Sequence, residues 1–195
     1  MRVAKRRGCI AQLIGLIILC LVLVYGVAAI TAPWSFHIGG VSTPLLSWSA
    51  TGVLHTKGGN YPLYVFLYPG SHFSRLRMDG LRPTGGVQGS AWLCTSRGVS
   101  QYLKMSGTIY NGWSSTEGSV ISFRLLEWYI FDTRPIRGYF DLYGRWNGTQ
   151  LVMEARDSLG HTFRSGLKIE HASVTLDPGS YSEFKAACGS SSLKN

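Results

Sequence analysis

The longest apolar segment of the chain lies near its N-terminus and is typical of a membrane-spanning helix. Residues 10–30 contain Gln12 as their only clearly polar side chain. At a rise of about 1.5 Å per residue, a helix of this length spans about 31 Å, which matches a hydrocarbon core of about 30 Å. We therefore expect a transmembrane signal-anchor helix over residues 9–32.

Positive charge flanks this segment on one side only. Basic residues occupy positions 5–7, and the next Lys or Arg after the segment is Lys57. The positive-inside rule then predicts a cytoplasmic flank over residues 1–8 and places everything after the helix outside the cytoplasm. The alternative is a cleaved signal peptide, although its apolar region is usually shorter than this one. Both interpretations export the remainder of the chain.

After a juxtamembrane linker at 33–45, apolar and polar residues alternate in short runs separated by glycine, which is typical of β-strands. Residues 46–54 have one apolar and one polar face. Residues 61–69 are apolar on both faces, so this strand is covered on both sides or its aromatic row lines a cavity or a contact surface. Further strands are predicted at 72–79, 87–95, 100–110, 119–131, 138–146, 150–157, 161–171 and 173–176.

The sequence around Asn147-Gly148 predicts a β-hairpin with a type I′ turn, in which both central residues have positive φ. The same residues begin an Asn-Gly-Thr sequon, which is also what a plain turn followed by a strand threonine looks like. In the first arm of the hairpin one face is predicted to be polar and the other apolar. The polar face comprises Tyr139, Asp141, Tyr143 and Arg145; the apolar face comprises Phe140, Leu142 and Trp146.

A short helix is predicted near residues 180–187, with Ser180 as N-cap and Glu183 completing a capping box. Residues 189–195 are expected to be a disordered tail. The succession of about nine or ten strands joined by short turns predicts a mainly β fold. We expect an antiparallel β-barrel or rolled β-sandwich over residues 46–188, preceded by one N-terminal transmembrane helix.

Only two of the four cysteines, Cys94 and Cys188, lie in the exported part. Export favours a disulfide between them, the alternative being two separate buried thiols. Neither cysteine has a CxxC partner or a histidine at ligand spacing, so no metal site is predicted, and no cofactor.

The formal net charge of +9 does not indicate a nucleic-acid partner. Four of the basic residues precede the apolar helix, and the others are scattered singly without a basic stripe. No GxSxG motif or paired histidines are present, so no catalytic residue is assigned and an enzyme is the less favoured class. In the hairpin, Asp141 and Glu154 are expected to oppose Arg156 or Arg145 as cross-strand ion pairs.

Aromatic residues are the most informative group in the exported part. They indicate either an ordinary β-core or a platform or cavity for an apolar or ring-shaped ligand. The residues assigned to such a ligand site are Tyr64, Phe66, Tyr68, Trp92, Trp128 and Trp146.

We therefore expect a single-pass protein of an inner or plasma membrane that contacts lipid through its anchor. Its domain is expected to be a non-enzymatic binding or assembly module, periplasmic or at the cell surface, for an apolar, lipid or glycan ligand or a protein partner. The alternatives are an accessory subunit of a membrane complex and a cell-envelope hydrolase with a site assembled across strands. The sequence leaves the oligomeric state open.

Overall fold

The structure is a computed structural model. It describes residues 2–31, 38, 47–68, 85–95, 98–110, 120–127, 139–156, 169 and 171–191. Helix α1 (Arg2–Thr31) is followed by eight strands and a second helix, α2 (Tyr181–Ser191). The strands are β1 (Trp48–Thr56), β2 (Gly59–Tyr68), β3 (Gly85–Cys94), β4 (Ser100–Tyr110), β5 (Val120–Glu127), β6 (Tyr139–Trp146), β7 (Leu151–Arg156) and β8 (Ser173–Pro178).

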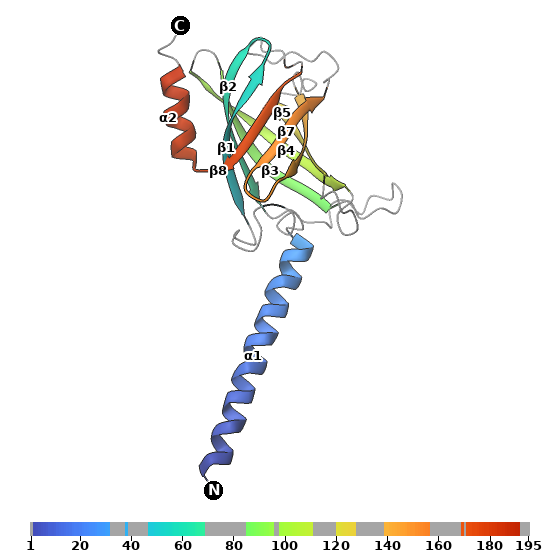
Figure 1. The fold of residues 1–195 in the computed structure, drawn as a ribbon, viewed down its shortest axis with the longest axis vertical. Helices are drawn as coiled ribbons and strands as arrows, with labels where there is room; N and C mark the ends of the chain where they lie inside the picture. Colours follow the sequence, from blue (N-terminus) through green and yellow to red (C-terminus); the bar gives the residue numbers. More distant parts are fainter. Residues whose placement is uncertain are drawn as a thin grey trace, which may run out of the picture.

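The eight strands form a closed antiparallel barrel in which each strand pairs with its neighbours in sequence. The barrel is closed by pairing between β1 and β8, in which Gly52 lies opposite Leu176 (Figure 1). Closure decides between the two predicted architectures in favour of the barrel. Its wall has eight strands rather than nine or ten. The two additional strands predicted at 72–79 and 161–171 lie wholly or almost wholly outside the described residues.

The inside of the barrel is filled by side chains from every strand. They form one core cluster whose largest fully buried members include Phe123, Phe140, Leu63 and Leu103. Eight strands enclose a space that side chains can fill. Ile38, from the predicted linker, is also fully buried in this cluster. The interior is therefore a packed core.

Alternation along the strands confirms the predicted faces. In β1, Trp48, Ala50 and Leu54 are buried in the barrel core. In β6, Phe140 and Leu142 are fully buried, whereas Asp141 and Tyr143 are half-buried.

The hairpin between β6 and β7 is present, but its turn differs from the predicted type I′. Asn147 N–H donates to Gln150 O at 3.0 Å, which makes Gly148 and Thr149 the two central residues. Of these four residues only Gly148 has positive φ, at 106°, as a type II′ turn requires at its first central position. Asn147 Oδ1 instead accepts hydrogen bonds from the N–H groups of Thr149 and Gln150 at 3.0 and 2.8 Å. Asn147 therefore stabilises the turn through the hydrogen bonds of its side-chain oxygen, and its backbone does not adopt the predicted positive φ.

Helix α1 contains an apolar span from Ile10 to Val27 with a mean hydropathy of 2.7, and none of that span is buried against the rest of the protein. It stands apart from the barrel in Figure 1. The helix begins at Arg2, so the basic flank belongs to its first turns. A span of this length and composition is consistent with a membrane anchor or a signal sequence.

Helix α2 confirms the short helix predicted near residues 180–187 and continues to Ser191. Its start is a capping box: Ser180 N–H donates to Glu183 Oε2 at 2.9 Å, and Glu183 N–H donates to Ser180 Oγ at 3.3 Å. The helix lies on the flank of the barrel, where it contacts β1 and β2 (Figure 1).

Candidate functional site

The structure brings four of the six predicted ligand residues together. Tyr64, Phe66 and Tyr68 of β2 and Trp92 of β3 occupy alternate positions to the inward-facing residues of their strands, so they lie on the outer face of the barrel. The other two do not join them. Trp146 packs on the barrel core, with its ring 6.0 Å from that of Trp48 in an edge-to-face arrangement. Trp128 lies outside the described residues.

Helix α2 explains why this outer face carries aromatic residues. Tyr64, Cys94, Phe184 and Cys188 form a second buried cluster, separate from the barrel core. Phe66, Trp92 and Tyr181 pack at its margin. We call these seven residues the outer cluster. The double-sided apolar pattern of β2 is thus explained: one face fills the barrel and the other supports α2.

Tyr64 is the central ring of the outer cluster and is only 7% exposed. Its ring centroid lies 5.6 Å from that of Trp92, 5.3 Å from that of Tyr181 and 6.2 Å from that of Phe184. These separations and the tilted or edge-to-face orientations are typical of favourable aromatic pairs. The Tyr64 ring is therefore a structural contact for α2, and the more accessible rings around it are the ones able to meet a ligand.

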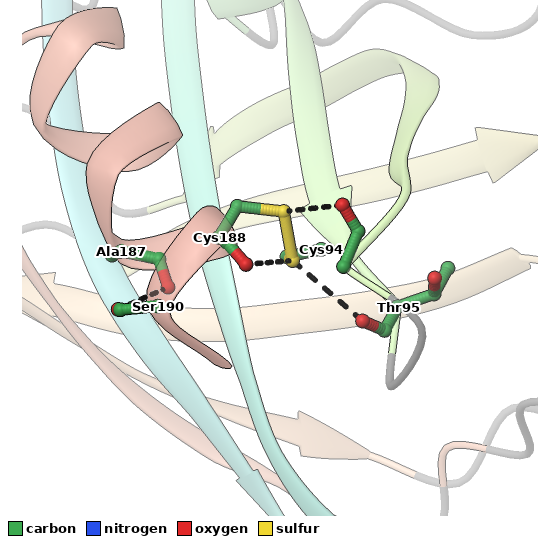
Figure 2. The surroundings of a disulfide bond; sticks show 6 residues. Cys94, Thr95, Ala187, Cys188 and Ser190 are labelled. Atoms are coloured by element: carbon green, nitrogen blue, oxygen red, sulfur yellow. Dashed lines mark hydrogen bonds between the residues drawn. A yellow bond between two sulfur atoms is a disulfide. The ribbon is translucent and has the colours of Figure 1, made fainter. Parts of the chain in front are cut away.

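A disulfide between Cys94 and Cys188 fixes α2 to the end of β3, as the sequence predicts (Figure 2). The two Cα atoms are 5.5 Å apart, and the residues are separated by 94 positions in sequence. Cys188 Sγ lies 3.4 Å from Gly98 O, in the turn that follows β3. The bridge therefore joins the far end of α2 to the β3–β4 connection, whereas the capping box begins the helix immediately after β8.

Strand register extends the aromatic face beyond α2. Outward side chains of β2, β3 and β4 lie opposite one another in three rows, and we call them together the ligand face. The rows are Tyr64–Trp92–Tyr102, Phe66–Ser90–Lys104 and Tyr68–Gln88–Ser106. All residues of the first row and all three β2 residues are aromatic, and the remaining four residues are polar.

The accessible part of the ligand face combines rings with hydrogen-bonding groups. Tyr102 is 42% exposed, and its ring centroid lies 5.4 Å from that of Trp92. Its hydroxyl group is 3.2 Å from Ser90 Oγ, so the two groups share a hydrogen bond. Lys104 is exposed two residues further along β4, and Gln88 is half-buried on β3. Sequence reasoning did not select Tyr102, because only the register places it beside Trp92.

The adjoining strands β5 and β6 carry a different arrangement, and Arg124 lies opposite Ser106 of β4. Arg124 of β5 binds Asp141 of β6 through two hydrogen bonds of 2.8 Å, and its guanidinium group lies 5.2 Å from the centre of the Tyr139 ring. The hydrogen bonds to Asp141 raise the pKa of Arg124 further above its already high value. Arg156 lies opposite Asp141 in the register, as predicted. On its other side, Asp141 forms an ion pair with Arg124 of β5.

Among the described residues, one carboxyl group is buried in the barrel wall. Glu127 is 4% exposed and accepts a 2.8 Å hydrogen bond from Gln101 Nε2. It continues the alternation of Ile121, Phe123 and Leu125, a pattern that could have revealed its inward orientation from sequence. Within the described ranges, no group of three or more His, Cys, Asp or Glu residues is placed to hold a metal ion.

Comparisons with protein-family models, with curated proteins and with solved structures found no match for this chain. Function is therefore inferred from the barrel, its outer face and its N-terminal helix.

Proposed function

We propose that the protein is a membrane-tethered binding module that holds a glycan on the ligand face of its barrel outside the cytoplasm. The observation that carries this proposal is the register of β2, β3 and β4, which sets the exposed Tyr102 ring and the half-buried rings around it beside hydroxyl, amide and ammonium groups on one surface. Pyranose rings present C–H faces that pack on aromatic rings, and their hydroxyl groups pair with polar side chains.

The packed interior supports an external rather than an internal ligand. The inward side chains of the described strands form one core cluster, and the largest of them are fully buried. In an eight-stranded barrel the interior holds either side chains or one small ligand. A ligand on the outer face needs no rearrangement of that core.

The tether and the location rest on two features. The Ile10–Val27 span has the length and hydropathy of a membrane-crossing helix, and basic residues precede it. The Cys94–Cys188 disulfide is typical of proteins in oxidising compartments outside the cytoplasm. We infer a single-pass protein with a cytoplasmic N-terminus and a periplasmic or cell-surface barrel.

A second candidate function is that of an accessory subunit whose anchor packs against other membrane helices. The observation that favours it is the complete exposure of the α1 span, in which a Cβ added at Gly15 or Gly26 would meet nothing within 4 Å. Small residues let membrane helices approach closely. The stable protein neighbours of the full chain, purified from its own membrane, would identify this role.

The glycan proposal is tested by titrating the full chain, held in zwitterionic nanodiscs, with neutral saccharides. Suitable probes are cellohexaose, chitin hexasaccharide and fully methyl-esterified polygalacturonate. Tyr102→Ala removes an exposed ring and should weaken binding of the preferred saccharide about three- to tenfold, the value of one aromatic contact. Tyr143→Ala, on the β6 outer face, is the matched control and should bind as the native protein does. Absence of saccharide binding, or equal loss in both variants, would overturn the proposal.

A further inference from the structure

The charge of the ligand face points to one class of glycan. Strands β2, β3 and β4 contain Lys104 and no Asp or Glu. Helix α2 adds Lys185, whose ammonium nitrogen lies 5.3 Å from the centre of the Tyr181 ring. The only acidic residue of α2 is Glu183, and its carboxylate accepts the Ser180 N–H at the start of the helix. Positive charge therefore predominates around the aromatic rings.

The two lysines lie on either side of a continuous path of rings. Tyr181 lies 5.3 Å from Trp92, and Trp92 lies 5.4 Å from Tyr102, as measured between ring centroids. Lys185 contacts the Tyr181 ring, and Lys104 is the next outward residue after Tyr102 on β4. A saccharide chain stacked along these rings would have an ammonium group near each end of the stacked segment.

We propose that the ligand is an acidic glycan, whose sugar rings stack along Tyr181, Trp92 and Tyr102 and whose carboxylate groups pair with Lys104 and Lys185. This inference rests on the proposed function and adds the charge of the ligand to it. On the adjoining strands β5 and β6, the charge of Arg124 is offset by that of Asp141, so this ion pair adds no net charge beside the face. A carboxylated sugar gains from both ammonium groups, whereas a neutral sugar uses only the rings and hydroxyl groups.

The test compares one polysaccharide with and without its charge. Polygalacturonate and its fully methyl-esterified form share a backbone and differ in carboxylate groups. The full chain in zwitterionic nanodiscs should bind the free acid about three- to tenfold more tightly at low ionic strength, and the difference should shrink in 0.5 M salt through screening. In Lys104→Gln/Lys185→Gln the preference should disappear while binding of the ester is retained. Lys57→Gln, in the exposed hairpin between β1 and β2, should keep the preference.

Each outcome separates the two proposals. Equal, Tyr102-dependent binding of acid and ester would overturn the acidic preference and leave the glycan proposal standing. Preference for the acid that survives in the double lysine variant would also overturn the assignment to Lys104 and Lys185. Binding of phosphatidylglycerol vesicles through the two lysines, with no binding of either polysaccharide, would overturn both proposals in favour of an anionic lipid surface.

Discussion

Among the described residues, four inward-facing glycines mark places where the backbone of a neighbouring strand approaches closely. These are Gly52, Gly89, Gly107 and Gly144. A Cβ at Gly107 would overlap the carbonyl oxygen of Ser122 on β5, and one at Gly144 would overlap that of Val152 on β7. Glycine inside a strand weakens it unless such an approach requires it. These residues therefore fix the curvature of the wall by leaving room for the adjacent backbone.

Gly107→Ala is expected to lower the free energy of unfolding by about 1–3 kcal/mol, because the added methyl group meets backbone atoms that cannot rotate away. The measurement is chemical unfolding of the full chain in micelles, followed by tryptophan fluorescence. Gly189→Ala is the control, since a Cβ there meets nothing within 4 Å and alanine favours a helix. Equal unfolding midpoints for the two variants would contradict the role assigned to Gly107.

At the scale of residues, the sequence is most informative where chemistry leaves few choices. Cys94 and Cys188 are the only cysteines of the sequence beyond the N-terminal apolar helix, so their pairing could be predicted once export of this part was expected. The aromatic residues could be selected as a group, but the sequence alone could not separate those that face the core from those that face α2. Strand register decides that Trp146 packs against the core and that Trp92 lies beside α2. Tyr102 could be assigned to the ligand face only after that register was known.

Helix α2 determines how the outer face of the barrel is packed, because the side chains of the outer cluster pack against it. Phe184 is only 1% exposed and packs against Tyr64. One end of the helix is fixed by the capping box and the other by the disulfide. The helix itself could be predicted because Ser180 and Glu183 have capping-box spacing. The predicted disulfide places Cys188 near the end of β3, but nothing else in residues 180–191 specifies that the helix covers β2.

Ser180→Ala removes the side chain that accepts the Glu183 N–H and should destabilise α2 by about 1 kcal/mol. Hydrogen exchange is the suitable readout, with faster exchange expected in the first turn of α2 and unchanged exchange in β5 and β6. Ser190→Ala, in the last turn of the helix, is the matched serine control. Unchanged protection of the first turn of α2 in the Ser180→Ala variant would show that the cap contributes nothing to the stability of the helix.

Replacing both Cys94 and Cys188 with Ala should lower the free energy of unfolding by about 2–5 kcal/mol, because the unfolded chain is no longer constrained by the bridge. Locally, α2 should exchange its amide hydrogens earlier than the barrel strands, since the covalent link between its far end and β3 is then absent. Cys20→Ser, in the exposed span of α1, should change neither quantity. Loss of protection in all strands together would instead mean that α2 and the barrel unfold as one unit.

At the scale of the whole molecule, α1 and the barrel have opposite surface properties. The span of α1 exposes its apolar side chains all round, whereas the barrel buries its own in two clusters. The N-terminal apolar helix could be predicted from residues 10–30 because an uninterrupted apolar run of this length is typical of a helix that crosses a membrane. The closed, eight-stranded form was harder to predict from sequence, since closure depends on pairing between residues as distant as Gly52 and Leu176.

The proposed topology predicts how thiols react in intact cells. In a Cys9→Ser background, Cys20 lies within the span and should resist a membrane-impermeant maleimide until detergent is added. A cysteine introduced by Lys57→Cys, in an exposed hairpin, should react from the outside at once. Labelling of Cys20 in intact cells would contradict a retained anchor, and protection of the Lys57→Cys thiol would contradict an external barrel.

Closure of the barrel through β1 and β8 also determines when this domain can fold. If the barrel is exported as proposed, β1 emerges early but its partner β8 emerges only after all the other strands. Cys94 must likewise wait for Cys188, which follows β8. Pairing between distant segments is slow compared with local structure formation. In the proposed topology, the chain would therefore cross the membrane as an open polypeptide tethered at α1, and it would become a closed and covalently fixed barrel only once β8 and α2 have arrived.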